Sequence, residues 1–84
     1  MNKITVVART LKNNDIDIKA YRDRESAVAQ VMEERFGEDW EMQMGDESWE
    51  LSDEIQFAFD NLYEDGWYSF DDRQIVVIKE VSVD

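Results

Sequence analysis

The spacing of hydrophobic positions in the first quarter of the chain predicts two β-strands. Residues 3–11 (KITVVARTL) are rich in β-branched side chains, which favour strands. Residues 15–21 (DIDIKAY) alternate between polar and apolar, so that Ile16, Ile18 and Ala20 share one face. The polar stretch KNND between the two segments is typical of a turn. The segments are therefore predicted to form a β-hairpin.

The hydrophobic spacing then changes to that of a helix with both ends marked. Asp23 is a candidate N-cap, because its side chain can accept a hydrogen bond from a free amide of the first turn. Gly37 is a candidate for the left-handed residue that ends many helices. The predicted core face of this helix consists of the apolar residues at helical spacing, which are Ala27, Val28, Val31, Met32 and Phe36.

A second helix is predicted to begin at Ser52 and to end at Gly66, with a start near Ser48 as the alternative. Asp53 and Glu54 lie in its first turn, where carboxylates interact favourably with the positive end of the helix dipole. Its predicted core face follows the spacing i, i+3, i+4 and i+7 and consists of Ile55, Ala58, Phe59 and Leu62.

Three further segments have the pattern of strands. Residues 39–44 (DWEMQM) alternate with period two and predict a third strand before the second helix. Residues 67–70 predict a short strand, followed by a turn at Asp71 and Asp72. Residues 73–81 (RQIVVIKEV) predict a final strand, and the continuous apolar run within it favours a central position in the sheet.

Together these elements predict an α+β fold in the order ββαβαββ. An antiparallel sheet of four or five strands is expected to have two helices on one face. The 84 residues suffice for one small core, so residues 1–84 are expected to form a single domain. No long apolar segment predicts a membrane span or a signal peptide.

The net charge of −12 is concentrated in one part of the chain. Positive and negative side chains nearly balance in residues 1–37 and 73–84, whereas residues 38–72 contain thirteen acids and no basic residue. A block of one sign repels itself and lowers stability, while solubility would be served by mixed charges. Aromatic and aliphatic residues are frequent in the block, so we expect it to be folded and not to be a disordered acidic tail.

The composition argues against catalysis and against a dedicated metal site. The chain has no His and no Cys, which are the most common general base, thiol nucleophile and metal ligand. Paired carboxylates remain as an alternative, although a chain of this length seldom builds the cleft that they need. An EF-hand alignment with Gly66 at the sixth position puts Tyr63 at position 3, where it has no suitable oxygen ligand. The same alignment puts Asp72 at position 12, where an EF-hand has a bidentate Glu. We expect no enzymatic activity, cofactor or metal site.

Four residues of the second predicted helix form one stripe opposite its core face. They are Asp53, Phe57, Asp60 and Glu64, at i, i+4, i+7 and i+11. Asp60 and Glu64 are about 6 Å apart along an α-helix axis, close to the roughly 6.8 Å axial advance of two phosphates on one DNA strand. A solvated helix face normally has Lys or Arg four residues from its acids, and this stripe has none. We interpret the stripe as a binding surface, with an ordinary acidic face as the alternative.

In size, acidity and lack of catalytic residues, the chain resembles the small phage-encoded inhibitors that mimic DNA, namely anti-restriction and anti-CRISPR proteins. The segment DEIQFAFDNLYEDGW followed by a terminal strand is similar to the acidic helix-then-strand ending of some anti-CRISPR proteins that occupy the DNA site of their effector nuclease. The predicted N-terminal hairpin differs from the helix that opens some of those proteins.

The predicted function is that of a small acidic inhibitor or decoy, which binds the basic nucleic-acid site of a partner protein such as a CRISPR effector or a restriction enzyme. We expect a nucleic-acid-binding partner with a basic groove, no direct binding to nucleic acid or membrane, and a location in the cytoplasm, that of the host cell if the protein is phage-encoded. The predicted partner-binding residues are Asp53, Phe57, Asp60, Glu64, Asp65, Trp67, Asp71 and Asp72. The alternative is a non-catalytic structural or accessory phage or prophage module that acts through oligomerisation.

Overall fold

Four strands form one antiparallel sheet in the computed structural model, which describes residues 2–11, 13–46, 48, 51–70 and 73–83. The order across the sheet is β2-β1-β4-β3, so the first and last strands of the chain are paired at its centre. Their bounds are β1 Asn2–Thr10, β2 Ile16–Tyr21, β3 Trp67–Ser69 and β4 Ile75–Val83. The predicted α+β class, the N-terminal hairpin and the central position of the last strand are confirmed.

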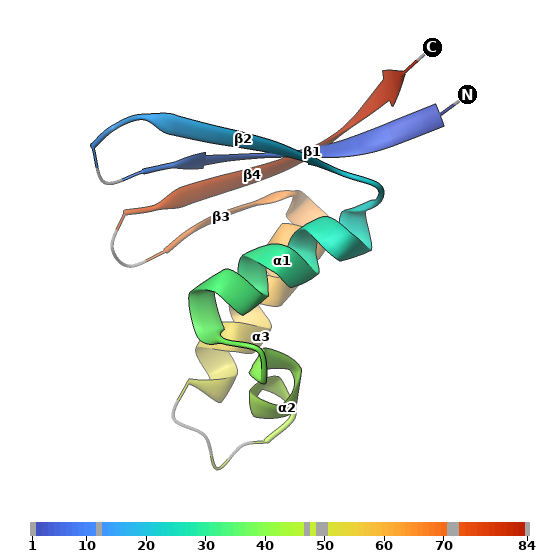
Figure 1. Cartoon of the computed structure of the whole chain (residues 1–84). Helices are drawn as coiled ribbons and strands as arrows, with labels where there is room; N and C mark the ends of the chain where they lie inside the picture. Colours follow the sequence, from blue (N-terminus) through green and yellow to red (C-terminus); the bar gives the residue numbers. More distant parts are fainter. Residues whose placement is uncertain (1, 12, 47, 49–50, 71–72, 84) are drawn as a thin grey trace.

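The helical segments lie on one side of this sheet (Figure 1). They are α1 (Arg24–Phe36), α2 (Trp40–Met44), α3 (Ser52–Asp60) and the π-helical turn η1 (Asn61–Asp65), which continues α3. The protein therefore has two layers, a sheet and a helical layer.

Helix α1 begins as the sequence predicts. The carboxylate of Asp23 accepts a hydrogen bond from the amide of Ser26 at 2.7 Å, which identifies Asp23 as the N-cap. The predicted core face is confirmed, with Phe36 only partly buried. Gly37 ends the helix, but its φ of 98° and ψ of 170° place it outside the left-handed helical region. The expected left-handed conformation at this position is therefore wrong, although the positive φ still favours glycine.

The expected third strand at residues 39–44 is wrong, because this segment forms helix α2. The amide of Gln43 donates to the carbonyl of Asp39 at 3.0 Å, and the Gln43 side-chain amide donates to the Asp39 carboxylate at 2.7 Å. Trp40 and Gln43 are buried three residues apart, which is a helical spacing. In a segment this short, the apolar positions fit both the period of two of a strand and the 3.6-residue period of a helix. Alternation alone therefore could not distinguish a strand from a helix.

The second helix begins at Ser52 as predicted and ends at Gly66 after the π-helical turn. Gly66 has φ 81° and ψ 14°, the left-handed conformation that glycine adopts without strain. Its amide donates to the carbonyl of Asn61 at 2.9 Å, and its carbonyl accepts from the amide of Ile78 at 2.6 Å. A single residue thus ends the helical layer and attaches it to the central strand β4.

Arg24 connects the start of α1 to η1 and β4, the two elements that meet at Gly66. Its Nη1 donates to the carbonyl of Tyr63 in η1 at 2.5 Å, and its Nε lies 3.5 Å from a carboxylate oxygen of Glu80 in β4. The side chain of the first residue of α1 thus contacts both η1 and the sheet, and it positions the acidic end of the second helix relative to them.

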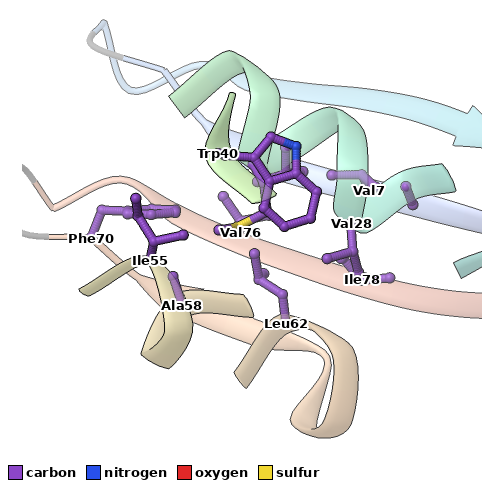
Figure 2. Packing of buried hydrophobic residues seen from close by; sticks show 12 residues of the cluster. Val7, Val28, Trp40, Ile55, Ala58, Leu62, Phe70, Val76 and Ile78 are labelled. Carbon is purple, nitrogen blue, oxygen red and sulfur yellow. The ribbon is translucent and has the colours of Figure 1, made fainter. Parts of the chain in front are cut away.

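The hydrophobic core fills the space between the sheet and the helical segments (Figure 2). Val76 and Ile78 project from β4 towards Leu62 and Val28 in this layer. The residues of the core are Val7, Ala27, Val28, Val31, Met32, Trp40, Ile55, Ala58, Leu62, Phe70, Val76 and Ile78. Burial of these side chains is the main favourable contribution to folding.

The helices cover only one face of the sheet. On β4, Val76 and Ile78 are buried against the helices, whereas Ile75 and Val77 point to the opposite face and are exposed. On β2, Asp17 faces the helical side, where Arg9 donates to it. The apolar positions Ile16, Ile18 and Ala20, which the alternation places together, are therefore on the side away from the helices.

Candidate functional site

The acidic stripe predicted from the sequence lies along α3 and η1. Asp53, Phe57, Asp60 and Glu64 are all exposed, and the buried residues Ile55, Ala58 and Leu62 occupy the opposite side of the same helical segment. Asp65 is exposed at the end of η1. The π-helical turn makes the last turn wider than that of an α-helix, so the spacing from Asp60 to Glu64 differs from the regular geometry.

The ion pairs between described residues lie outside this stripe. Arg9 pairs with Asp17 and Glu34, Lys19 with Glu34, Arg22 with Asp23, and Arg24 with Glu80. None of these pairs includes Asp53, Asp60, Glu64 or Asp65. The stripe therefore keeps its negative charge without neutralisation from these cations.

The contrast with Glu34 shows what a cation does to a carboxylate in this protein. The hydrogen bond from the Arg9 guanidinium holds the pKa of Glu34 below its ordinary value, with smaller contributions from Gln30 and Lys19. In the stripe, Asp60 accepts one neutral hydrogen bond, from the side-chain amide of Gln56 at 2.9 Å. A cation from a partner protein can supply the interaction that Glu34 already has.

Phe57 belongs to the stripe, whereas Trp67 does not. The ring of Phe57 packs edge-on against Tyr68 of β3, with 5.9 Å between the ring centroids, and its outer surface is exposed. Trp67 pairs with the exposed residue Val77 in the sheet register, so its side chain lies on the face away from the helices. The structure does not bring Trp67 together with the acidic stripe. The predicted positions Asp71 and Asp72 lie outside the described residues.

A groove between the helical segments was not anticipated from the sequence. It has a volume of about 390 Å³ and is lined by Glu25, Ala29, Trp40, Glu41, Met44, Phe59 and Tyr63. The ring of Phe59 stacks on Trp40 at 5.7 Å with an interplanar angle of 29°, and on Tyr63 at 5.7 Å with an angle of 20°. The i, i+4 spacing of Phe59 and Tyr63 was a signal for this stack. Because residues 39–44 were expected to form a strand, the stacking of Trp40 on Phe59 could not be predicted.

The groove combines aromatic faces with two carboxylates. Aromatic rings attract Arg and Lys through their π-systems, and carboxylates pair with the same cations. Glu25 and Glu41 supply the negative charge from α1 and α2, and the stack supplies the aromatic surface. A guanidinium group is both planar and charged, so its chemistry matches this lining.

No group of three or more acidic side chains in the described part of the chain is arranged to hold a metal ion. Residues 61–65, the first five of the twelve positions tested against an EF-hand loop, form the helical turn η1. Among the described residues, no helix is both long enough and apolar enough to cross a membrane.

Comparisons with protein-family models, with curated proteins and with solved structures found no match to this chain.

Proposed function

We propose that the protein is a small acidic inhibitor or decoy that occupies the basic nucleic-acid site of a partner protein, such as a CRISPR effector or a restriction enzyme. The observation that supports this function is the exposed row of carboxylates on α3 and η1, none of which takes part in the described ion pairs. A single-sign field of this kind steers association with an oppositely charged site and selects against partners of the same charge.

The residues of the stripe have two different roles in this proposal. Asp53, Asp60, Glu64 and Asp65 supply charge where a nucleic acid would present phosphates. Phe57 supplies a desolvated contact, because it is a large exposed ring supported from below by Tyr68. Charge then determines the rate of association, and the ring slows dissociation.

The groove gives the partner's basic residues a specific place to bind. One Arg or Lys side chain of the partner enters between Glu25 and Glu41 and contacts the exposed ring of Tyr63, which stacks on Phe59. A nucleic-acid site is rich in such side chains, and Arg is enriched in the centres of protein interfaces. The stripe and the groove together fit a basic protein surface better than either would alone.

Charge reversal tests the stripe against a control of equal charge change. The variant Asp60→Lys with Glu64→Lys removes acids from the stripe, and the variant Asp15→Lys with Glu33→Lys removes exposed acids from the hairpin turn and from α1. Binding and inhibition of DNA cleavage are measured against a panel of purified CRISPR effector nucleases and restriction endonucleases. We expect the stripe variant to weaken binding to its target by about tenfold or more, and the control to weaken it several-fold less.

Salt, competition and a groove variant complete the test. Affinity should decrease with rising ionic strength, and DNA should compete for the same site. Phe57→Ala should increase the dissociation rate with little change in salt dependence, and Tyr63→Ala should weaken binding through the groove. Equal losses from the two charge-reversal variants would mean that only overall acidity matters. Absence of binding and of inhibition across the panel would refute the proposed function for these partner classes.

A further inference from the structure

The sheet face turned away from the helices, called here the open face, is apolar over all four strands. Its large exposed apolar side chains are Ile16, Ile18, Trp67, Ile75, Val77 and Val81. In Figure 1 the helical segments are all on the other side of the sheet. Contiguous apolar surface of this kind on a small protein marks an interaction site more often than a solvated surface.

The open face is a continuous surface, because its apolar residues are neighbours in the sheet register. One row crosses the whole sheet: Ile18 pairs with Ala8, Ala8 with Val77, and Val77 with Trp67. Directly paired residues of antiparallel strands lie on the same face at about 4.5–5.5 Å between Cβ atoms. The small side chain of Ala8 lies at the centre of this row, between the larger Ile18 and Val77.

Charge is nearly absent from the open face. Among its described strand positions there is one charged side chain, Lys79, and no acid. β3 begins at Trp67, opposite Val77, so Lys79 lies beyond this short strand and its stem can extend to keep the ammonium group in solvent. The acids of the helical layer lie on the other side of the sheet. The open face is therefore the part of this surface where a second molecule of net charge −12 meets the least repulsion.

The size of the open face matches a small symmetric interface. The four strands contain 9, 6, 3 and 9 residues, and at about 3.3 Å per residue and about 4.8 Å between strands they cover roughly 430 Å². Two copies packed face to face then bury roughly 860 Å² in total, which is in the range of weak, transient interfaces and above most crystal contacts. The apolar run of β4 is also typical of a strand covered on both faces, and the helices cover only one.

We infer that the open face is the interface of a homodimer, in which two copies pack their sheets against each other around a twofold axis. The arrangement is a β-sandwich with the two helical layers on the outside, and the sheets lie about 10 Å apart. Both acidic stripes lie in the outer helical layers and remain accessible. The inference goes beyond the proposed partner binding and does not depend on it, because it uses the other face of the molecule.

The homodimer has a salt dependence opposite to that of partner binding. Two copies of net charge −12 repel each other at long range, while their contact surface is apolar. Added salt screens this repulsion, and self-association should therefore strengthen as ionic strength rises. Binding to a basic partner should weaken over the same range. Self-association and partner binding can therefore be tested independently of each other.

Analytical ultracentrifugation of the full chain tests the inference with matched variants. Wild-type protein is diluted from roughly 500 µM to roughly 1 µM, a range that covers the weak affinity expected of a small interface. We expect twice the 10.0 kDa chain mass at high concentration and the monomer mass after dilution. The variant Ile18→Lys with Val77→Lys places two charges in the open face and should raise the dissociation constant more than about tenfold.

The control variant is Met42→Lys with Leu51→Lys, which makes the same charge change on the helical side. Met42 is 72% exposed and Leu51 46%, against 65% for Ile18 and 43% for Val77, so the two variants disturb the folded monomer to a similar degree. The control should dimerise at least as well as the wild type. NMR of the wild type provides a second measurement, with concentration-dependent shifts expected at Trp67 and Val77.

Four results would overturn the inference. The first is a monomer mass for the wild type at every concentration and ionic strength. The second is equal self-association of the two variants. The third is a dimer whose concentration-dependent amide protection is confined to the β2 edge, since that pattern indicates pairing of strands from two copies and not packing of their faces. Binding of monomeric protein to phosphatidylcholine vesicles through Trp67 would likewise assign the open face to a lipid surface.

Discussion

Replacement of Gly66 by alanine should destabilise the protein more than replacement of Gly45, the described glycine whose φ is negative. Gly66 has φ 81°, and a Cβ atom at this position would lie 2.9 Å from the carbonyl oxygen of Ile78. That oxygen belongs to the backbone of a strand held on both sides by β1 and β3. The carbonyl oxygen of Ile78 therefore cannot move away at a low energetic cost, whereas the end of a flexible side chain could.

The expected cost has two parts. A residue with a Cβ in the left-handed region costs about 1–2 kcal/mol, and forcing an extra carbon into a packed site typically costs about 1–3 kcal/mol. Gly66→Ala should thus lower the free energy of unfolding by roughly 2–5 kcal/mol, out of the roughly 4–13 kcal/mol expected for 84 residues. One kcal/mol corresponds to about 4–8 °C in Tm for a domain of this size, so Tm should fall by roughly 10 °C or more.

Gly45→Ala is the matched control, and urea unfolding followed by circular dichroism is the assay. Gly45 has φ −86° and ψ −3°, and the nearest atoms to its added Cβ would be 3.9 Å away. Alanine fits there without strain, and it should be neutral or raise the unfolding free energy by about 0.4–1 kcal/mol. Similar stability changes in the two variants, or a Gly66→Ala variant as stable as the wild type, would refute the account of this junction.

Two further predictions concern the core and the salt-bridged carboxylate. Leu62→Ala should lower the free energy of unfolding by about 2–5 kcal/mol, because Leu62 is fully buried between the helical layer and the sheet. Leu51→Ala, at an exposed position, should change it little. Equal effects of the two variants in urea unfolding would contradict this packing. The pKa of Glu34 is lowered in the folded state by its hydrogen bond from Arg9, so its contribution to stability is present above the ordinary glutamate pKa and is lost as the pH falls through the lowered value. Glu34→Gln should flatten the acid part of a Tm against pH curve, and a variant curve parallel to that of the wild type would show that this pair does not contribute.

Most of the fold could be predicted because each element has a strong local signal. Asp23 and Gly66 mark helix ends by chemistry that acts within a few residues, and the structure uses both. The apolar spacing of α1 and α3 identified their buried faces correctly. The segment at residues 39–44 was misassigned because Trp40, Met42 and Met44 fit period two, while the buried pair Trp40 and Gln43 fits a helix.

The two surfaces of the protein depended on tertiary structure and could be predicted only in part. The stripe of Asp53, Asp60 and Glu64 follows from helical spacing on one element. The groove does not, because Glu25, Trp40 and Phe59 come from three separate helices. Alternation placed Ile16 and Ile18 on one face of β2, but only the helix packing determines which face is covered. Asp17 pairs with Arg9 on the helical side, so strand alternation places Ile16 and Ile18 on the open face.

The pairing of β1 with β4 affects how the chain folds as it is synthesised. Asn2 is opposite Val83 and Arg9 is opposite Val76, so the central ladder of the sheet joins segments separated by nearly the whole chain. Pairings this distant in sequence close slowly, because a long loop must be ordered before any of the contacts form. On the ribosome, β1 can pair only with β2 until β4 has emerged, and its other edge stays open to unproductive pairing with nascent neighbours. Completion of the sheet therefore depends on β4, and the core side of β1 cannot be fully covered before this strand has left the ribosome.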